Sequence, residues 1–201
     1  MENRTRNAVE TYEIIADWFS ENRYQGLIEK SYLDQLISKM NQTRTVLDLG
    51  CGTGMPIANY LISQGLHLTG IDASSRMLAI ARQQLPNTEF IHADMRQLNM
   101  GRKFDAIIAW HSFFHLPDED QPAMFDIFKT HLKPNGLLLF TSGQTRGEAW
   151  GINGGQQLFH ASLDTQEYKR LLKAHHFKIL TYQVDDEGCG NATVWLVQLE
   201  S

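Results

Sequence analysis

One segment constrains the fold of this 201-residue chain more than any other, because a short apolar run there breaks off in a cluster of glycines. The run Thr45–Leu49 has the length of a buried strand. It leads into the glycine turn Gly50–Gly54, and Pro56 suits the first turn of a following helix, where a missing N–H costs little. Glycines adopt positive φ angles and let a ligand approach the backbone. The segment therefore predicts a strand, a tight turn and a helix N-terminus, which can bind a nucleotide-like or carboxylate-bearing ligand.

Beyond the glycine turn, strand-like apolar runs alternate with amphipathic helical segments. This alternation predicts a parallel sheet covered by helices on both faces, which is the α/β class. The last two runs have no helix between them, so we expect them to pair antiparallel. We expect a turn at Pro134–Gly136 and a glycine-rich loop at about 142–155. The further strands are expected at 66–71, 88–92, 104–110, 137–141, 177–184 and 193–199.

Two amphipathic helical segments precede the first strand. Apolar residues recur at helical spacing from Val9 to Phe19 and again from Leu27 to Met40. A chain of this length forms one domain and buries enough surface to need no disulfide or metal for stability. We therefore expect a single domain over 1–201, with a helical N-terminal cap at 1–42 and an α/β core at 43–201.

Composition narrows the functional classes. The net charge of −5 weighs against a nucleic-acid binder, which usually carries a basic face. The two cysteines, Cys51 and Cys189, are too few for a disulfide scaffold or a cysteine-rich zinc site. The first residues lack the apolar core of a secretory signal, and no apolar run approaches the roughly 18 residues of a membrane helix. We expect a soluble, cytoplasmic protein without a membrane partner.

Polar and aromatic residues follow the predicted strands at positions where open α/β sheets bind ligands. Asp72 ends the second strand, where its carboxylate can accept hydrogen bonds from both hydroxyls of a ribose. Asp94 ends the third strand, where it can face an adenine amino group, and Trp110 ends the fourth. Because the carboxyl ends of parallel strands meet at one edge, these residues and the glycine turn predict one nucleotide-type site.

Taken in order, these pieces resemble the class I S-adenosylmethionine-dependent methyltransferases, and most of all their small-molecule type, the methyltransferase-domain type 11/25-like families. The resemblance covers about residues 43 to 142. It implies a Rossmann-like seven-stranded sheet of order 3-2-1-4-5-7-6, with strand 7 antiparallel and helices on both faces. The matching pieces are Val46–Gly54, Gly70–Ser74 with Met77, His92–Met95, Phe104–Ala109 and Leu132–Leu137.

The resemblance also implies the cofactor, S-adenosyl-L-methionine, and its product, S-adenosyl-L-homocysteine. Asp72 would hold the ribose, Asp94 the adenine amino group, and Trp110 would lie near the methionine moiety and the sulfonium. Asp48 would orient the glycine turn or contact the methionine amino group through water. The full set of implied cofactor-binding residues is Asp48, Gly50, Cys51, Gly52, Asp72, Ala73, Met77, Asp94, Met95 and Trp110.

Three alternatives to a small-molecule methyltransferase remain open. A nicotinamide-dependent oxidoreductase is disfavoured, because its Gly-x-Gly-x-x-Gly fingerprint differs from the Gly-x-Gly-x-Gly spacing of the glycine turn. A methyltransferase acting on protein or RNA would favour a basic groove or an open site. A protein that binds the cofactor without catalysis is the third alternative, because fold alone does not establish activity.

The segment 110–117 lies where the transferred methyl group would be. It lacks the Asn-Pro-Pro-Tyr type of motif that methyltransferases acting on planar nitrogens of nucleic acid or glutamine carry there. His111 and His115 are candidate catalytic residues, as a general base or as groups that orient the acceptor. His115 could instead hydrogen-bond a backbone carbonyl and position the turn. The two histidines have the spacing of a metal pair but lack further ligands, so we expect no metal.

Aromatic residues from two other regions are expected to shape the acceptor pocket. The N-terminal segment would lie over the site as a lid, and the glycine-rich loop would supply an aromatic wall, which suits a planar or cationic acceptor. A monomer and a homodimer are both compatible with the sequence. The predicted pocket residues are Tyr12, Trp18, Tyr24, His115, Trp150 and His160.

Overall fold

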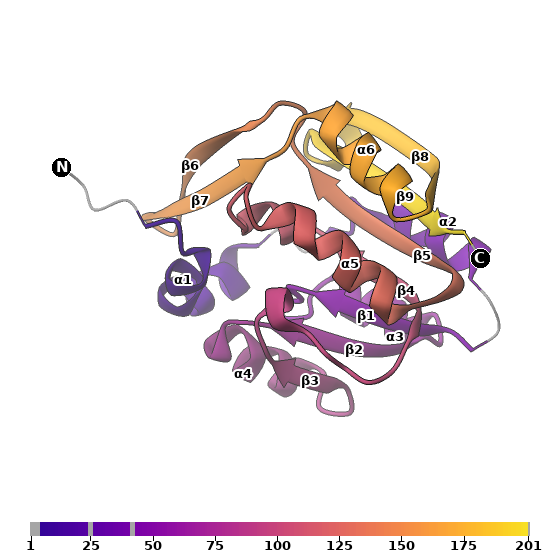
Figure 1. Cartoon of the computed structure of the whole chain (residues 1–201). Coiled ribbons are helices and arrows are strands. Elements are labelled where there is room, and N and C mark those ends of the chain that lie inside the picture. The colour runs from indigo at the N-terminus through magenta and orange to yellow at the C-terminus, as the bar shows by residue number, and fades with distance from the viewer. Residues whose placement is uncertain (1–4, 24–25, 41–42, 201) are drawn as a thin grey trace.

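The computed structural model describes residues 5–23, 26–40 and 43–200 and contains a mixed sheet (Figure 1). Among these residues the sheet has seven strands in the order β3-β2-β1-β4-β5-β9-β8, and β9 runs antiparallel to both of its neighbours. The predicted order and the antiparallel strand are confirmed. The strands are β1 (Thr45–Leu49), β2 (His67–Asp72), β3 (Glu89–His92), β4 (Phe104–Ala109), β5 (Leu132–Ser142), β8 (Phe177–Asp186) and β9 (Ala192–Leu199).

Helices cover both faces of this sheet, as the alternating pattern predicts (Figure 1). Phe125, Phe128 and Leu172, from α5 and α6, belong to the apolar cluster on one face. Leu36 and Leu61, from α2 and α3, belong to the cluster on the other. All six residues of β4 are buried, as expected of a strand packed on both faces. The helices are α1 (Ala8–Asn22), α2 (Lys30–Lys39), α3 (Ile57–Ser63), α4 (Ser75–Gln84), α5 (Gln121–His131) and α6 (Thr165–Ala174), with short 3-10 turns at η1 (Met95–Gln97), η2 (Phe113–His115) and η3 (Glu187–Cys189).

Local signals fix several helix starts. The Ser74 hydroxyl accepts a hydrogen bond from the Met77 amide at 3.1 Å and so caps α4. Asp164 and Glu167 form a reciprocal capping box at the start of α6. These short-range contacts determine where α4 and α6 begin.

The predicted glycine-rich loop is wrong. Most of it belongs to a separate two-stranded antiparallel hairpin, β6 (Gly147–Asn153) and β7 (Gln156–Ser162). Gly154 and Gly155 have positive φ angles of 55° and 74° and form the turn between the strands. The predicted turn at Pro134–Gly136 is likewise part of β5, where the pairing with β4 shifts register. Gly154 and Gly155 thus mark a hairpin turn, whereas Gly136 lies where the pairing of β5 with β4 is irregular.

The two N-terminal helices occupy different places. α1 lies between α4 and the β6–β7 hairpin, above the carboxyl end of the sheet (Figure 1). α2 instead packs on a face of the sheet, with Tyr32, Leu33 and Leu36 in its apolar cluster. Of the two predicted cap helices, α1 therefore lies over the end of the sheet as a cap, whereas α2 belongs to the layer of helices that covers one face of the sheet. None of the described helices is long and apolar enough to cross a bilayer.

A buried polar network ties the hairpin to the sheet's helices. The Tyr168 hydroxyl donates to the Gln121 side-chain oxygen at 2.6 Å, and the Leu163 amide donates to the Tyr168 hydroxyl at 3.2 Å. The Gln121 amide group in turn donates to the Ala161 carbonyl at 3.0 Å. Tyr168 and Gln121 are completely buried. The end of β7 is therefore held against α5 and α6 by groups that have no access to water.

We predict that Tyr168→Phe lowers the free energy of unfolding by about 1–3 kcal/mol, because it leaves a buried amide and a buried side-chain oxygen without a partner. Urea unfolding followed by circular dichroism measures this change. Tyr60→Phe is the matched control, because the Tyr60 hydroxyl bonds Asp34 in an exposed pair and its loss should cost only a few tenths of a kcal/mol. Equal effects for the two substitutions would contradict the role of the network.

Candidate functional site

A cavity of about 770 Å³ opens at the carboxyl ends of the central strands, beneath α1. Its walls come from the glycine turn, the ends of β2, β3 and β4, the η2 segment, α1 and the hairpin. Ten predicted cofactor-binding residues all line it: Asp48, Gly50, Cys51, Gly52, Asp72, Ala73, Met77, Asp94, Met95 and Trp110. The structure thus brings together residues spread over more than sixty positions of the sequence.

The glycine turn is shaped by a close approach between two loops. Gly50 has a φ of 74°, and a Cβ atom at this position would collide with the Ser112 side chain. The Ser112 hydroxyl donates to the Leu49 carbonyl at 2.5 Å, which locks the two loops together. A Cβ at Gly52 would meet nothing within 4 Å. Gly50 is therefore required for packing, whereas Gly52 leaves the backbone open toward the cavity.

Two carboxylates lie under this turn. Asp72 accepts hydrogen bonds at 2.8 Å from the Gly52 amide on one oxygen and from the Ser74 amide on the other. Burial raises the pKa of Asp72, although these amides oppose the rise. Asp48 is only 4% exposed, and burial together with the charge of Asp72 raises its pKa to about 7, against the opposing charge of Arg23. The site therefore holds closely spaced acidic groups that a cationic ligand would stabilise.

Asp94 lies farther along the edge, at the end of β3. Its carboxylate pairs with Arg96 at 2.6 Å, and Arg96 also reaches Asp120 at 2.8 Å. Although burial raises the pKa of Asp94, the hydrogen bonds of Arg96 hold it below its usual value. Asp94 is thus an ionised acceptor fixed in place, as the predicted contact with an amino group requires.

Trp110 lies between the cavity and the apolar cluster that α2 and α3 form on one face of the sheet. It is 5% exposed, and its ring lies 6.0 Å from that of Tyr32 and 5.4 Å from that of His111. Its indole nitrogen has no hydrogen-bond partner among the described residues. A buried donor of this kind is uncommon in folded proteins.

His111 enters the cavity from a strained backbone. Its φ of 48° is unusual for a residue other than glycine, and its amide donates to the Thr141 hydroxyl at 2.9 Å. Its ring lies 5.6 Å from that of Phe114. Burial, together with the charges of Arg23 and His160, lowers the pKa of His111 to about 4. The imidazole is therefore neutral near pH 7 and has one ring nitrogen that can accept a hydrogen bond.

His115 is held at both ring nitrogens. Nδ1 lies 2.7 Å from the Phe159 carbonyl, so it carries the proton and donates it there. Nε2 then accepts a hydrogen bond from the Tyr12 hydroxyl at 3.0 Å. Burial lowers the pKa of His115 to about 3. The backbone-carbonyl contact considered for His115 from the sequence is present, and its second nitrogen serves Tyr12.

The predicted pocket residues divide into two groups. Tyr12, His115 and His160 line the cavity, whereas Trp18 and Trp150 do not. Trp150 pairs with Phe159 across the hairpin, and alternate residues of a strand face opposite ways, so His160 faces the cavity and Trp150 faces away. Trp18 is 42% exposed beside Gly154, and Tyr24 lies outside the described residues. Lining residues that the sequence did not single out include Arg23, Phe114, Asn153 and Leu158.

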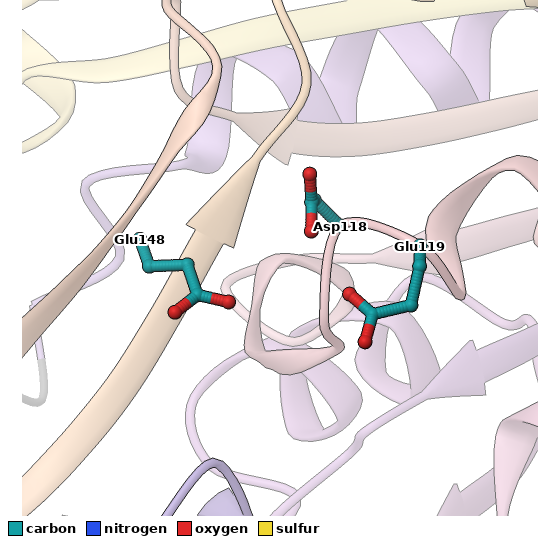
Figure 2. A group of neighbouring side chains, drawn as sticks. All are labelled: Asp118, Glu119 and Glu148. Carbon is teal, nitrogen blue, oxygen red and sulfur yellow. The ribbon is translucent and has the colours of Figure 1, made fainter.

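Three acidic side chains outside the cavity, Asp118, Glu119 and Glu148, lie close enough together to share a cation (Figure 2). The guanidinium of Arg6 already supplies the positive charge among these three acids. It pairs with Glu119 at 2.8 Å, lies 3.8 Å from Asp118 and also contacts Glu148. Arg146 neutralises Asp118 from another direction at 2.7 Å. We therefore interpret the group as an ion-pair network that fastens the N-terminal segment to the hairpin and to the start of α5.

Comparisons with known proteins agree with the geometry. A family described as a methyltransferase domain matches residues 46–136. The dTDP-3-amino-3,6-dideoxy-alpha-D-glucopyranose N,N-dimethyltransferase of Streptomyces fradiae is 35% identical over 97 residues, which are 47% of this chain and 38% of that protein. An uncharacterized methyltransferase of Oceanobacillus iheyensis is 25% identical over 190 residues, 89% of this chain and 81% of that protein. The chain thus spans less than half the length of some of the curated relatives that it matches.

The fold has solved counterparts over its whole length. The S-adenosylmethionine-bound structure of an amino pentose methyltransferase from Micromonospora echinaspora superposes with a TM-score of 0.71 at 17% identity, covering 99% of each chain. At this identity the likeness concerns the fold. Residues 46–136, the strand order and the placement of the cavity at the carboxyl end of the sheet all match a class I S-adenosylmethionine-dependent methyltransferase domain.

Proposed function

We propose that this protein transfers a methyl group from S-adenosylmethionine to a small-molecule acceptor and releases S-adenosylhomocysteine. The observation that carries the proposal is the fixed carboxylate of Asp72 beside the open backbone at Gly52. Each oxygen of Asp72 accepts one backbone hydrogen bond and keeps a further lone pair. A ribose diol above the glycine turn would use those lone pairs, as in other nucleotide-binding α/β sheets.

The other predicted cofactor residues extend this site in both directions. Asp94 is ionised and fixed by Arg96, which suits it to accept a hydrogen bond from an adenine amino group. Met77, 1% exposed, and Met95 supply apolar wall on the same side of the cavity. Asp48 lies at the other end, next to the glycine turn, where a methionyl ammonium would offset the cost of its buried charge.

The chain's main contribution to methyl transfer would be positioning and exclusion of water. The bound cofactor supplies a methyl group on a sulfonium that is already a good leaving group. Phe114, His111 and Tyr12 surround the remaining part of the cavity, and α1 covers it. A covered cavity bordered by aromatic rings supports a small acceptor over a protein or RNA substrate, which would need an open approach.

The two candidate catalytic histidines have different environments. The Nε2 lone pair of His115 is used by the Tyr12 hydroxyl, so His115 positions Tyr12 and closes the pocket wall. No hydrogen bond to the His111 ring nitrogens is present among the described residues, and the ring is neutral. His111 is therefore the better candidate to contact the acceptor, and its lowered pKa favours a role in orienting the acceptor by a hydrogen bond over that of a general base.

We predict that S-adenosylhomocysteine raises the melting temperature of the protein and that NAD does not. A ligand at 100 times its Kd should stabilise the fold by about 2.7 kcal/mol. Asp72→Asn should remove most of this shift, because an amide cannot accept hydrogen bonds on both sides. Asp126→Asn is the control, because Asp126 is an exposed side chain of α5. A shift with NAD alone, or an unchanged shift in Asp72→Asn, would contradict the proposal.

We also predict a pH signature of the neutral His115. Below about pH 6.5 the unfolded chain binds a proton at His115 that the folded protein does not bind, so the wild type loses stability as the pH falls. The advantage of the wild type over His115→Gln should therefore shrink by up to about 1.4 kcal/mol per pH unit between pH 6.5 and 4. Denaturant unfolding at several pH values measures it.

Tyr12→Phe is the matched control for this experiment, because it removes the partner of Nε2 and keeps the buried imidazole. Its stability difference from the wild type should depend on pH far less than that of His115→Gln. A constant difference between wild type and His115→Gln across this range would show that His115 is not held neutral.

A further inference from the structure

Acidic side chains are divided unevenly between the two parts of the cavity. Among the described residues that line it, the carboxylates are Asp48, Asp72 and Asp94, and all three lie at or near the ends of β1, β2 and β3. The remaining wall comes from α1, the segment after β4 and the β6–β7 hairpin, and its described residues contribute no carboxylate. We call this region the acceptor part of the cavity. Its lining residues include Tyr12, His111, Phe114, His115, Asn153 and His160.

The acidic cluster beside the N-terminal segment does not alter this division. Asp118, Glu119 and Glu148 are not among the lining residues. Arg6, which does line the cavity, pairs with Glu119 and Glu148, and Arg146 pairs with Asp118 at 2.7 Å. These carboxylates are therefore already engaged by guanidinium groups, and a positively charged ligand in the acceptor part would have no acidic partner among its described lining residues.

The imidazoles of the acceptor part indicate how costly a positive charge is there. Burial is the largest cause that lowers the pKa of His111 to about 4 and that of His115 to about 3. Burial also lowers the pKa of His160. A ligand ammonium in the same surroundings would lose its hydration without gaining a carboxylate, so an uncharged ligand is favoured.

The wall of the acceptor part consists of rings in mutual contact. The Phe114 ring lies 5.6 Å from the His111 ring, 4.8 Å from the His115 ring and 5.4 Å from the His160 ring. The planes of Phe114 and His160 differ by only 33°, although one residue lies in η2 and the other in β7. A planar ligand can stack on such rings with an offset, whereas a puckered saturated ring covers less of their surface.

His111 supplies a polar group within this wall. His115 has both ring nitrogens engaged, one by the Phe159 carbonyl and one by the Tyr12 hydroxyl. The ring nitrogens of His111 have no hydrogen bond within the described part of the chain, and a neutral imidazole offers one N–H and one lone pair. A hydroxyl or N–H group on a stacked ligand can therefore donate a hydrogen bond to His111.

We propose that the methyl acceptor is an uncharged, planar aromatic compound whose ring lies against Phe114 and His160 and whose hydroxyl or N–H group contacts His111. The inference rests on the proposed function, because it names the acceptor class of the same site. In the transfer, the bond between sulfur and the methyl carbon breaks, and its electron pair stays on sulfur. A lone pair of the acceptor's oxygen or nitrogen forms the new bond to the methyl carbon, and the proton that this atom carried is released to water.

The first test uses three compounds that share one skeleton of two fused rings. 2-Naphthol is planar and uncharged, decahydro-2-naphthol is its saturated counterpart, and 2-naphthylmethylamine is planar but carries an ammonium group near pH 7. Isothermal titration calorimetry measures the binding of each compound to the protein saturated with S-adenosylhomocysteine. We expect 2-naphthol to bind on the order of 10-fold more tightly than each of the other two.

Variants then assign these preferences to the wall. Phe114→Leu and His160→Leu should each reduce the preference for 2-naphthol over its saturated counterpart, because each removes a flat ring from the wall. Asn153→Asp adds a carboxylate at nearly constant shape and should tighten the binding of 2-naphthylmethylamine. Trp150→Phe is the matched control, because Trp150 lies on the same hairpin but faces away from the cavity, and it should change neither preference.

The inference is overturned if 2-naphthol does not bind, or if either of the other compounds binds as tightly to the wild type. It is also overturned if Phe114→Leu and His160→Leu both keep the full preference, or if Asn153→Asp leaves the binding of 2-naphthylmethylamine unchanged. Retained binding of S-adenosylhomocysteine shows that each variant is folded. A wild type that does not bind S-adenosylhomocysteine would instead refute the proposed function, so the two failures are distinguishable.

Discussion

The carboxylate of Asp72 connects the parts on which the site depends. It ends β2, accepts one hydrogen bond from the Gly52 amide and another from the Ser74 amide, and so joins the glycine turn to the start of α4. Burial makes this carboxylate costly, and the two amides offset part of that cost. The turn and the helix N-terminus are therefore held in one geometry by a group that also faces the cavity, so an adenosyl ligand meets a surface that is already ordered.

The part of the cavity that we assign to the cofactor, which the glycine turn, Asp72, Asp94 and Trp110 line, could be predicted from the sequence because its geometry is local. A strand that ends in glycines, an acid at the end of the next strand and a serine cap each act within a few residues of their position in the chain. Parallel pairing then places all strand ends at one edge, so the lining positions of Asp72, Asp94 and Trp110 follow from the strand order. The confirmed sheet order is what the family resemblance implies, and the antiparallel pairing of the last two strands follows also from the absence of a helix between them.

The part of the cavity beside the hairpin, which we assign to the acceptor, could not be predicted in the same way, because its geometry depends on the long-range pairing of β6 with β7. The choice between Trp150 and His160 depends on the register of β6 against β7, since a shift of one residue exchanges the faces of every side chain. Glycines at 143, 147, 151, 154 and 155 favour a loop by composition, and only the pairing shows that two of them form a hairpin turn. Arg23 gave no sequence signal, because a single arginine after a helix is usually a solvated residue.

α1 connects the two halves by anchoring at both ends of the opening. On one side Glu13 accepts hydrogen bonds from the Ser75 and Arg76 amides at the start of α4, near Asp72. On the other side the Thr11 hydroxyl donates to the Gln157 carbonyl of β7 at 2.9 Å. A helix bound to both walls cannot follow one wall without straining its contacts to the other. The distance between the two walls of the cavity is therefore set by α1. Because the same helix also carries Tyr12 into the cavity, α1 both covers the site and fixes its two walls relative to each other.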